Sequence, residues 1–286
     1  MKSNRILRAW CLALFAGPAS ADTPTGKSGY HLFRPVPVEQ MRELSTDRPD
    51  KTESPYTVDA GHVQVEMDLA AFTYDRHNSD RSDTRIESWS FGTVNLKFGL
   101  LNNVDFQIVL EPWSVSRTVE RPGGRARADG FGDLTFRTKV NLWGNDGGST
   151  AFALMPFVKV PANQDDLGNH AVEGGLILPL AVELPAGWGM GVMTEIDFNE
   201  DADGRGHHAE WINSITFSHD IAGRLGGYVE LFTAVTGERH APWVATLDVG
   251  LTYGLTDNVQ LDAGVNFGLT RSADDVAPFV GLSVRF

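Results

Sequence analysis

The chain has 286 residues, a formal net charge of −13 at neutral pH and one cysteine, Cys11. An acidic chain is poorly suited to nucleic acid, whose binding depends on basic side chains that neutralise phosphates. No stretch approaches the roughly 18 consecutive apolar residues that indicate a membrane-spanning helix, so a helical membrane protein is excluded.

Residues 1–21 have the features of a secretory signal peptide. Lys2, Arg5 and Arg8 form a positive start, residues 9–16 are mostly apolar, and Ala19-Ser20-Ala21 resembles a cleavage site. Because the apolar stretch is far shorter than a spanning helix, we expect cleavage rather than anchoring. Removing three positive charges and no negative ones would change the net charge from −13 to −16. It would also remove Cys11, which excludes disulfides and thiolate chemistry in the mature chain.

Residues 22–61 differ from the rest of the chain. They are rich in proline and charge and contain no long alternation of apolar and polar residues. Their composition leaves two alternatives open, a tail in the periplasm or a segment that folds into the mouth of the domain formed by residues 62–286.

From residue 62 onward the chain alternates with a period of two, which predicts β-strands with two different environments on their faces. In 133–142, for example, Leu134, Phe136 and Thr138 alternate with Arg137 and Lys139. The expected strands are 62–74, 88–99, 104–113, 130–143, 149–160, 170–184, 188–198, 208–219, 224–234, 242–254, 259–269 and 276–286.

The fold class predicted is all-β, a transmembrane antiparallel β-barrel of about 12 strands. A soluble sandwich also alternates, but three further features favour a barrel. The apolar faces have the length of about 9–11 residues that crosses hydrocarbon. Short connections alternate with longer, more charged ones such as 75–87 and 114–129. Aromatic residues lie near the strand ends, as at interfaces: Trp89, Trp113, Trp143, Trp188, Trp211 and Trp243.

The chain ends on an alternating strand, 280–286, whose last residue is Phe286. A final strand would close the barrel against the first, because an open edge in lipid leaves backbone groups unsatisfied. A terminal phenylalanine resembles the signal read by the barrel-assembly machinery, which is therefore an expected partner together with outer-membrane lipid.

Three motifs resemble an outer-membrane protein family named for the meta-cleavage pathway of phenol degradation. They are the stretch 45–58 with 61–66 (STDRPDKTESPYTV and GHVQVE), the stretch 172–180 (VEGGLILPL), and the stretch 254–258 (GLTDN). The chain departs from the family at Asp59-Ala60, where a proline is usual, and at Ala162-Asn163, where Thr-Gly is usual. The resemblance implies a cell-outer-membrane barrel that admits small, often aromatic, molecules, without identifying the permeant.

The alternation places a set of charged side chains on the inward face, because a charge facing lipid costs about 2–4 kcal/mol near the midplane. These charges either tune permeation through a transverse field or form a solvated lining without selectivity. The set is Glu66, Asp68, Lys97, Asp105, Arg137, Lys139, Glu195, Asp248 and Asp262.

Residues 46–56 are a candidate plug or gate, with a mobile periplasmic tail as the alternative. Their cations could pair with inward carboxylates, and their prolines stiffen the backbone. The residues proposed for this role are Asp47, Arg48, Pro49, Asp50, Lys51, Glu53 and Tyr56.

No catalytic motif, metal site or cofactor is expected. The nucleophile elbow, zinc-helix and phosphate-loop patterns are missing from the sequence. The loop 199–210 has the calcium-loop spacing at Asn199, Asp201, Asp203, Gly204 and Glu210, but its flanks are expected strands, so an acidic surface loop explains it better.

The sequence therefore predicts a non-enzymatic channel for passive passage of small, hydrophobic or aromatic molecules. Two alternatives stay open, a non-conducting structural or adhesion barrel and a lipid-modifying barrel enzyme.

Overall fold

The computed structural model describes residues 26–80, 82–120, 123–165, 167–201, 204–238 and 242–286, so the expected signal peptide lies outside the described residues. Short 3₁₀ turns occur at Lys27–Gly29, Val38–Gln40 and Pro185–Gly187. Within the described ranges, no helix has the length and apolar character needed to cross a membrane. The strands are β1 (Val63–Asp75), β2 (Arg85–Phe91), β3 (Val94–Leu101), β4 (Val104–Leu110), β5 (Trp113–Val119), β6 (Arg125–Gly130), β7 (Leu134–Trp143), β8 (Thr150–Val160), β9 (Glu173–Glu183), β10 (Trp188–Glu200), β11 (His207–Ala222), β12 (Leu225–Thr236), β13 (Val244–Thr256), β14 (Val259–Gly268) and β15 (Val276–Arg285).

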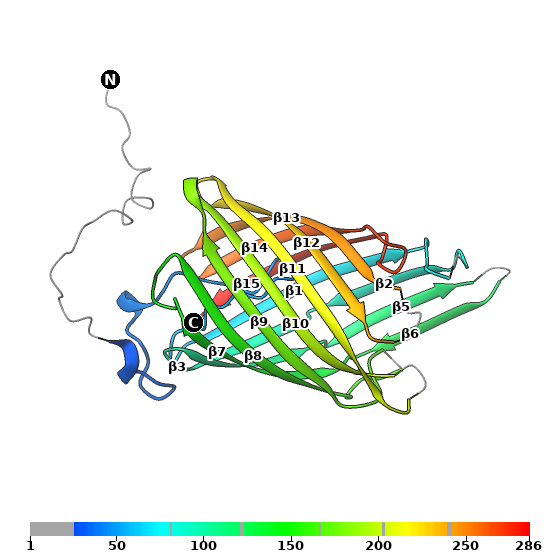
Figure 1. Cartoon of the computed structure of the whole chain (residues 1–286), viewed down its shortest axis with the longest axis horizontal. Helices are drawn as coiled ribbons and strands as arrows, with labels where there is room; N and C mark the ends of the chain where they lie inside the picture. The colour runs from blue at the N-terminus through cyan, green and yellow to red at the C-terminus, as the bar shows by residue number, and fades with distance from the viewer. Residues whose placement is uncertain (1–25, 81, 121–122, 166, 202–203, 239–241) are drawn as a thin grey trace, which may run out of the picture.

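These fifteen segments form the predicted closed, antiparallel barrel of twelve strands (Figure 1). The pairs β2 and β3, β4 and β5, and β6 and β7 each lie end to end along one strand of the barrel. β1 pairs with both β2 and β3, β2 and β3 pair with β5 and β4, and β5 and β4 pair with β6 and β7. The last strand, β15, pairs with β14 on one side and β1 on the other, which closes the sheet.

Three of the twelve strands are interrupted at the same height, between β2 and β3, between β4 and β5, and between β6 and β7. Gly92 adopts φ 70° between β2 and β3, and Pro112, which has no N–H for the ladder, separates β4 from β5. Beyond the break, β6 pairs with β5 alone, whereas β7 pairs with β4 and β8. Residues 161–165 and 167–172 follow β8 at this edge, and the Gln164 N–H donates to the carbonyl of Phe131 over 2.9 Å. The wall is therefore made partly of loop on this side.

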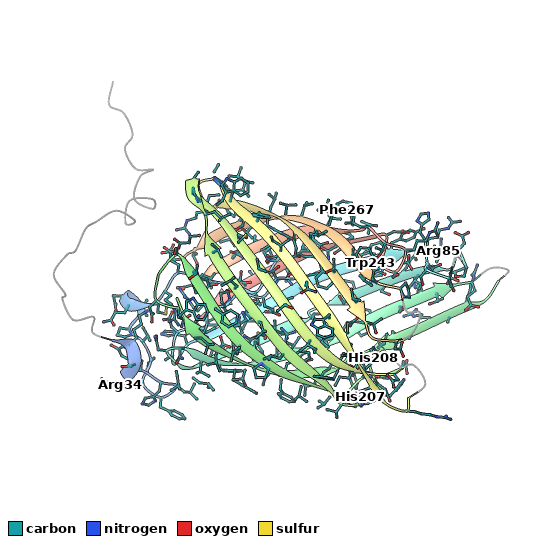
Figure 2. The ribbon with its side chains drawn as sticks, in the orientation of Figure 1. Arg34, Arg85, His207, His208, Trp243 and Phe267 are labelled. Atoms are coloured by element: carbon teal, nitrogen blue, oxygen red, sulfur yellow. The ribbon has the colours of Figure 1, made fainter. Side chains whose placement is uncertain are left out.

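Polar and apolar residues are distributed in the opposite way from a soluble protein. The largest fully buried side chains include Lys97, Lys139, Gln64 and Glu66, which point into the barrel. Large apolar side chains cover the outside, and the six predicted interfacial tryptophans are each 43–54 % exposed. Figure 2 shows Trp243 and Phe267 on this outer surface. An apolar exterior on a closed sheet is what a barrel in lipid requires.

The connections alternate in length as predicted, with one correction. The first described residues, the C-terminus and the short turns lie at one end of the barrel, and the longer connections lie at the other (Figure 1). The prediction of a long loop over 114–129 is wrong, because β5 and β6 occupy most of it and extend past the neighbouring strands. The alternation did not reveal these strands, because the outward face of the hairpin carries arginines. A strand surrounded by lipid must have an apolar outward face.

Candidate functional site: the lumen and its N-terminal segment

The lumen contains residues 41–60, here called the N-terminal segment. It has no helix or strand, and its polar groups bond to side chains on β1, β3, β7, β11, β12, β13 and β14. Because these strands surround the lumen, a segment bonded to all of them lies across it.

Asp47 occupies the centre of a buried cluster of charges. Its carboxylate pairs with the ammonium groups of Lys97 on β3 and Lys139 on β7, the latter at 2.5 Å. Its backbone N–H donates to Glu66 on β1 over 3.0 Å, and Lys97 also pairs with Glu66 at 2.5 Å. Burial alone would raise the pKa of Asp47, but the charges of Lys139 and Lys97 hold that pKa well below its usual range. Asp47 is therefore an anion that two buried cations require.

Arg48 joins the segment to the strands that close the barrel. Its guanidinium contacts Asp68 on β1 at 2.6 Å and Asp262 on β14 at 2.7 Å, and it lies over the ring of Phe279. Gly281 on β15 makes room for this group, since a Cβ there would collide with the guanidinium. The two carboxylates clamp the planar fork of arginine from opposite sides.

The next residues of the segment bond to three successive strands beside β14, namely β13, β12 and β11. The backbone N–H groups of Lys51 and Thr52 donate to the carboxylate of Glu230 on β12 over 2.9 and 2.8 Å. The Thr52 hydroxyl lies 2.6 Å from the Ser214 hydroxyl on β11. Lys51 also pairs with Asp248 on β13 at 3.1 Å.

Glu53 and Tyr56 complete the contacts with β7. The Glu53 carboxylate pairs with Arg137 at 2.6 Å. The Tyr56 carbonyl lies 3.5 Å from the Lys139 ammonium, and the Pro55 carbonyl accepts from Asn141 over 2.9 Å.

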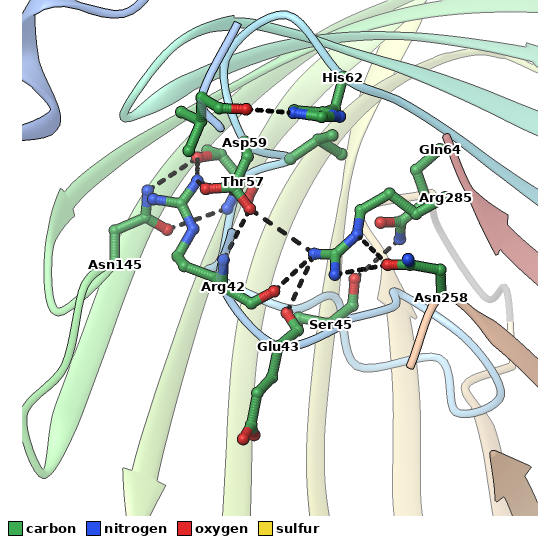
Figure 3. A network of polar contacts seen from close by, with 12 residues as sticks. Arg42, Glu43, Ser45, Thr57, Asp59, His62, Gln64, Asn145, Asn258 and Arg285 are labelled. Atoms are coloured by element: carbon green, nitrogen blue, oxygen red, sulfur yellow. Dashed lines mark hydrogen bonds and ion pairs between the residues drawn. The ribbon is translucent and has the colours of Figure 1, made fainter. Parts of the chain in front are cut away.

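A second polar network holds the segment at the end of the barrel where β15 ends (Figure 3). Asp59, which is 1 % exposed, accepts from the Arg42 N–H over 2.9 Å and lies 3.6 Å from the Arg285 guanidinium. Arg285, the last residue of β15, donates to the Arg42 carbonyl over 2.8 Å. Gly99 lets the Asp59 backbone approach β3, because a Cβ there would collide with the Asp59 carbonyl. The base of the segment is thus fixed to the closing strand.

Nearly all the charges predicted to face inward contact the segment. Besides those described above, Asp105 accepts from the Val58 N–H over 3.0 Å. Glu195 is inward on β10 beside Asp197. Among the predicted plug residues, Pro49 lines a cavity next to Arg48, and Asp50 lies near Glu230.

Sequence reasoning missed an apolar stripe on the lumen wall. Met155 on β8, Ile177 on β9 and Met193 on β10 are at most 2 % exposed and pack with Phe157 and Ile212. The sequence does contain a pattern that indicates this stripe, because residues 151–158 are apolar on both faces of the strand rather than on one. The lumen therefore has one apolar wall in addition to its charged ones.

Two cavities lie on the side of the longer loops, and the smaller of them adjoins the segment at Arg48 and Pro49. The larger, about 400 Å³, lies against β1, β2, β5 and β6 and has small polar side chains, Ser88, Ser90, Ser114 and Ser116, in its lining. The second, about 240 Å³, is lined by Arg48, Pro49, Asp68, Phe279 and neighbours. The first has the volume of a small-ligand pocket.

Among the residues with calcium-type spacing in 199–210, Asn199 and Glu210 bond to each other across β10 and β11 over 3.0 Å, and Asp203 lies outside the described residues. A different trio, Asp201, His208 and Glu238, places one ligand atom each within 4.8 Å of the others. One imidazole and two carboxylates have the chemistry of a divalent-cation site.

The chain belongs to the family described as "Putative MetA-pathway of phenol degradation", which matches residues 46–286 and thus includes most of the N-terminal segment. No curated protein sequence matches the chain significantly.

Solved barrels share its fold. An outer membrane channel from Pseudomonas putida F1 aligns with TM-score 0.58 and 13 % identity over 85 % of this chain and 100 % of that one. The β domain of the Bordetella autotransporter BrkA aligns with TM-score 0.50 and 11 % identity over 79 % and 99 %. At these identities the likeness concerns the fold alone.

Proposed function

We propose that the protein is an outer-membrane channel for passive passage of small amphipathic molecules, and that the N-terminal segment is its gate. The observation that carries the proposal is the way the segment is held. Ion pairs and hydrogen bonds to a polar lumen anchor it at Asp47, Arg48 and Thr52, and such bonds can be exchanged for bonds to water.

The lining of the lumen also favours one class of permeant. An apolar stripe at Met155, Ile177 and Met193 faces a charged wall, so an amphipathic molecule would find partners for both its parts. The cavity of about 400 Å³ offers space for a small ring. The family description names phenol degradation, and the Pseudomonas putida relative is titled a channel, which agrees with this proposal. No reaction is required of the protein.

Planar-bilayer recording tests the gate. The mature barrel without residues 45–56 should conduct at least severalfold more than the full mature chain, because deletion removes the bonds to Lys97, Asp262 and Glu230 together. Barrels of both forms should show the same heat-dependent gel mobility, which controls for folding. Equal conductance of the two folded forms would refute the gate.

Uptake into proteoliposomes tests the permeant. Phenol and benzoate should enter faster than a sugar of similar size, and deletion of 45–56 should raise all the rates. If neither form conducts or transports, the structural or adhesion barrel is the better reading. Hydrolysis of labelled phospholipid by the purified protein would instead favour the lipid-modifying enzyme.

A further inference from the structure

The hairpin β5–β6 and the adjoining β2 carry four arginines on their outward face. Their cross-strand register arranges the face in rows. Glu87, Arg117 and Arg127 form one row, and Arg85, Val119 and Arg125 form the next row outward. All four arginines are exposed. Figure 2 shows Arg85 at the end of the barrel opposite Arg34.

Aromatic side chains lie directly below these rows on the same face. Trp89 pairs with Val115, and Phe91 pairs with Trp113, each two residues along its strand from the row before. Trp89 and Phe91 stack at 6.1 Å, and Phe91 and Trp113 stack at 5.5 Å, with rings exposed. Such rings mark the depth at which hydrocarbon meets the lipid headgroups.

The arginines therefore lie at headgroup height. Arg117 is four residues beyond Trp113, which is roughly 13 Å along a strand at about 3.3 Å per residue, and less along the membrane normal because barrel strands tilt. This is above the hydrocarbon and within reach of the phosphates and sugars of the outer leaflet. The inward face of the same hairpin carries only small residues such as Ser114, Ser116 and Ala128.

The charge of the patch is only partly compensated, because its four arginines share two carboxylates on the same face, Glu87 and Asp129. Arg117 and Arg127 are directly opposite each other, an arrangement that destabilises a strand pair unless an anion lies between. Arg127 pairs with Asp129 at 3.1 Å and Arg85 with Glu87 at 3.6 Å. Within the described part of the chain, Arg117 and Arg125 have no ion-pair partner. A chain of net charge −13 nevertheless concentrates arginines here.

We infer that Arg85, Arg117, Arg125 and Arg127 bind the phosphate groups of a phosphorylated glycolipid of the outer leaflet. The planar guanidinium groups suit phosphate, and the rings below contact the acyl chains of the same lipid. Clustered basic residues at the membrane surface bind anionic headgroups in this way. The inference rests on the outer-membrane placement proposed above, but it does not require that the barrel conduct.

Binding of lipid A to the detergent-solubilised full mature chain tests the inference. The chain should bind bisphosphorylated lipid A at least about tenfold more tightly than R117Q/R125Q/R127Q does, since each basic group contributes to headgroup affinity. The triple lysine variant at the same positions should keep most of the affinity. R224Q is the matched control, because Arg224 is 51 % exposed but lies at the other end of the barrel. Heat-dependent gel mobility verifies that each variant is folded.

Three results would overturn the inference. Equal affinity of the wild type and the triple glutamine variant would show that the arginines do not bind the lipid. Equal affinity for dephosphorylated lipid A would show that phosphate is not recognised. Displacement of the lipid by inorganic phosphate alone would assign the patch to free phosphate instead. Because binding is measured without conductance, failure here is distinguishable from failure of the channel proposal.

Discussion

At the scale of single residues, the docking of the N-terminal segment depends most on Asp47. It neutralises Lys97 and Lys139, which are buried on neighbouring parts of the wall. Removing one partner of a buried ion pair costs about 3–5 kcal/mol, because the remaining charge stays buried without compensation. Loss of the Asp47 charge would therefore destabilise the docked state of the segment.

Asp47→Asn should therefore raise the open probability of single channels at least about tenfold while leaving the barrel folded. Asp257→Asn is the control, because Asp257 pairs with Arg224 on an exposed turn and exposed pairs contribute little. If the two variants gated alike, Asp47 would not hold the segment.

The buried carboxyl of Asp50 predicts a dependence on pH for the proposed gate. Burial and the nearby carboxylate of Glu230 raise the pKa of Asp50 to about 8, with Glu53 contributing in the same direction. In the released segment the pKa would be near its ordinary value of 3.8. A group that binds its proton more tightly when docked stabilises docking at low pH, and this contribution falls as pH rises from about 3.8 to about 8. The pKa of Asp47 is lowered, so Asp47 stays ionised while Asp50 titrates.

We therefore expect the open probability to rise between pH 5 and pH 8.5 in bilayer recordings. Asp50→Asn should flatten that rise, because the amide has no proton to lose. A steep rise that persisted in the variant would assign the pH dependence to other groups.

At the scale of elements, the apolar stripe of β8, β9 and β10 should determine which molecules pass. Ile177→Gln places a polar group between Met155 and Met193, where an amphipathic permeant would make its apolar contact. Phenol uptake should fall severalfold relative to sugar uptake in proteoliposomes. Thr194→Gln, on the same sheet but at a position that alternates to the other face, is the comparison. An unchanged ratio of the two uptake rates would mean that the stripe only packs.

The strands could be predicted where their two faces differ in polarity. The predicted strand 259–269 corresponds to β14 (Val259–Gly268) because Val259, Leu261 and Ala263 alternate with Gln260 and Asp262. Prediction failed over 114–129, where charged residues lie on the outward face beyond the apolar band. It also missed the apolar stripe, because 151–158 is apolar on both faces and periodicity alone cannot assign the inner one.

At the scale of the whole molecule, the barrel follows from the sequence but its occupied lumen does not. The contacts of the N-terminal segment join residues far apart, such as Arg48 with Asp262 and Thr52 with Glu230. No local pattern encodes such pairs. Strand glycines such as Gly99 and Gly281 are local traces, because a glycine inside a strand often marks the close approach of another group. Inward charges could be listed from alternation, but their partners could not.

The measurement that tests the gate most directly is a disulfide that locks it. The hydroxyl oxygens of Thr52 and Ser214 are 2.6 Å apart, so cysteines at these positions place their sulfurs within reach of a bond, and the region after the signal peptide has no cysteine to compete.

Oxidised T52C/S214C should stay closed in planar bilayers, and reduction in the same membrane should restore the gating of the wild type, while each single-cysteine variant responds to neither treatment. An oxidised, fully cross-linked barrel that conducts as well as the reduced one would contradict the account, because ions would then pass with the segment still in place.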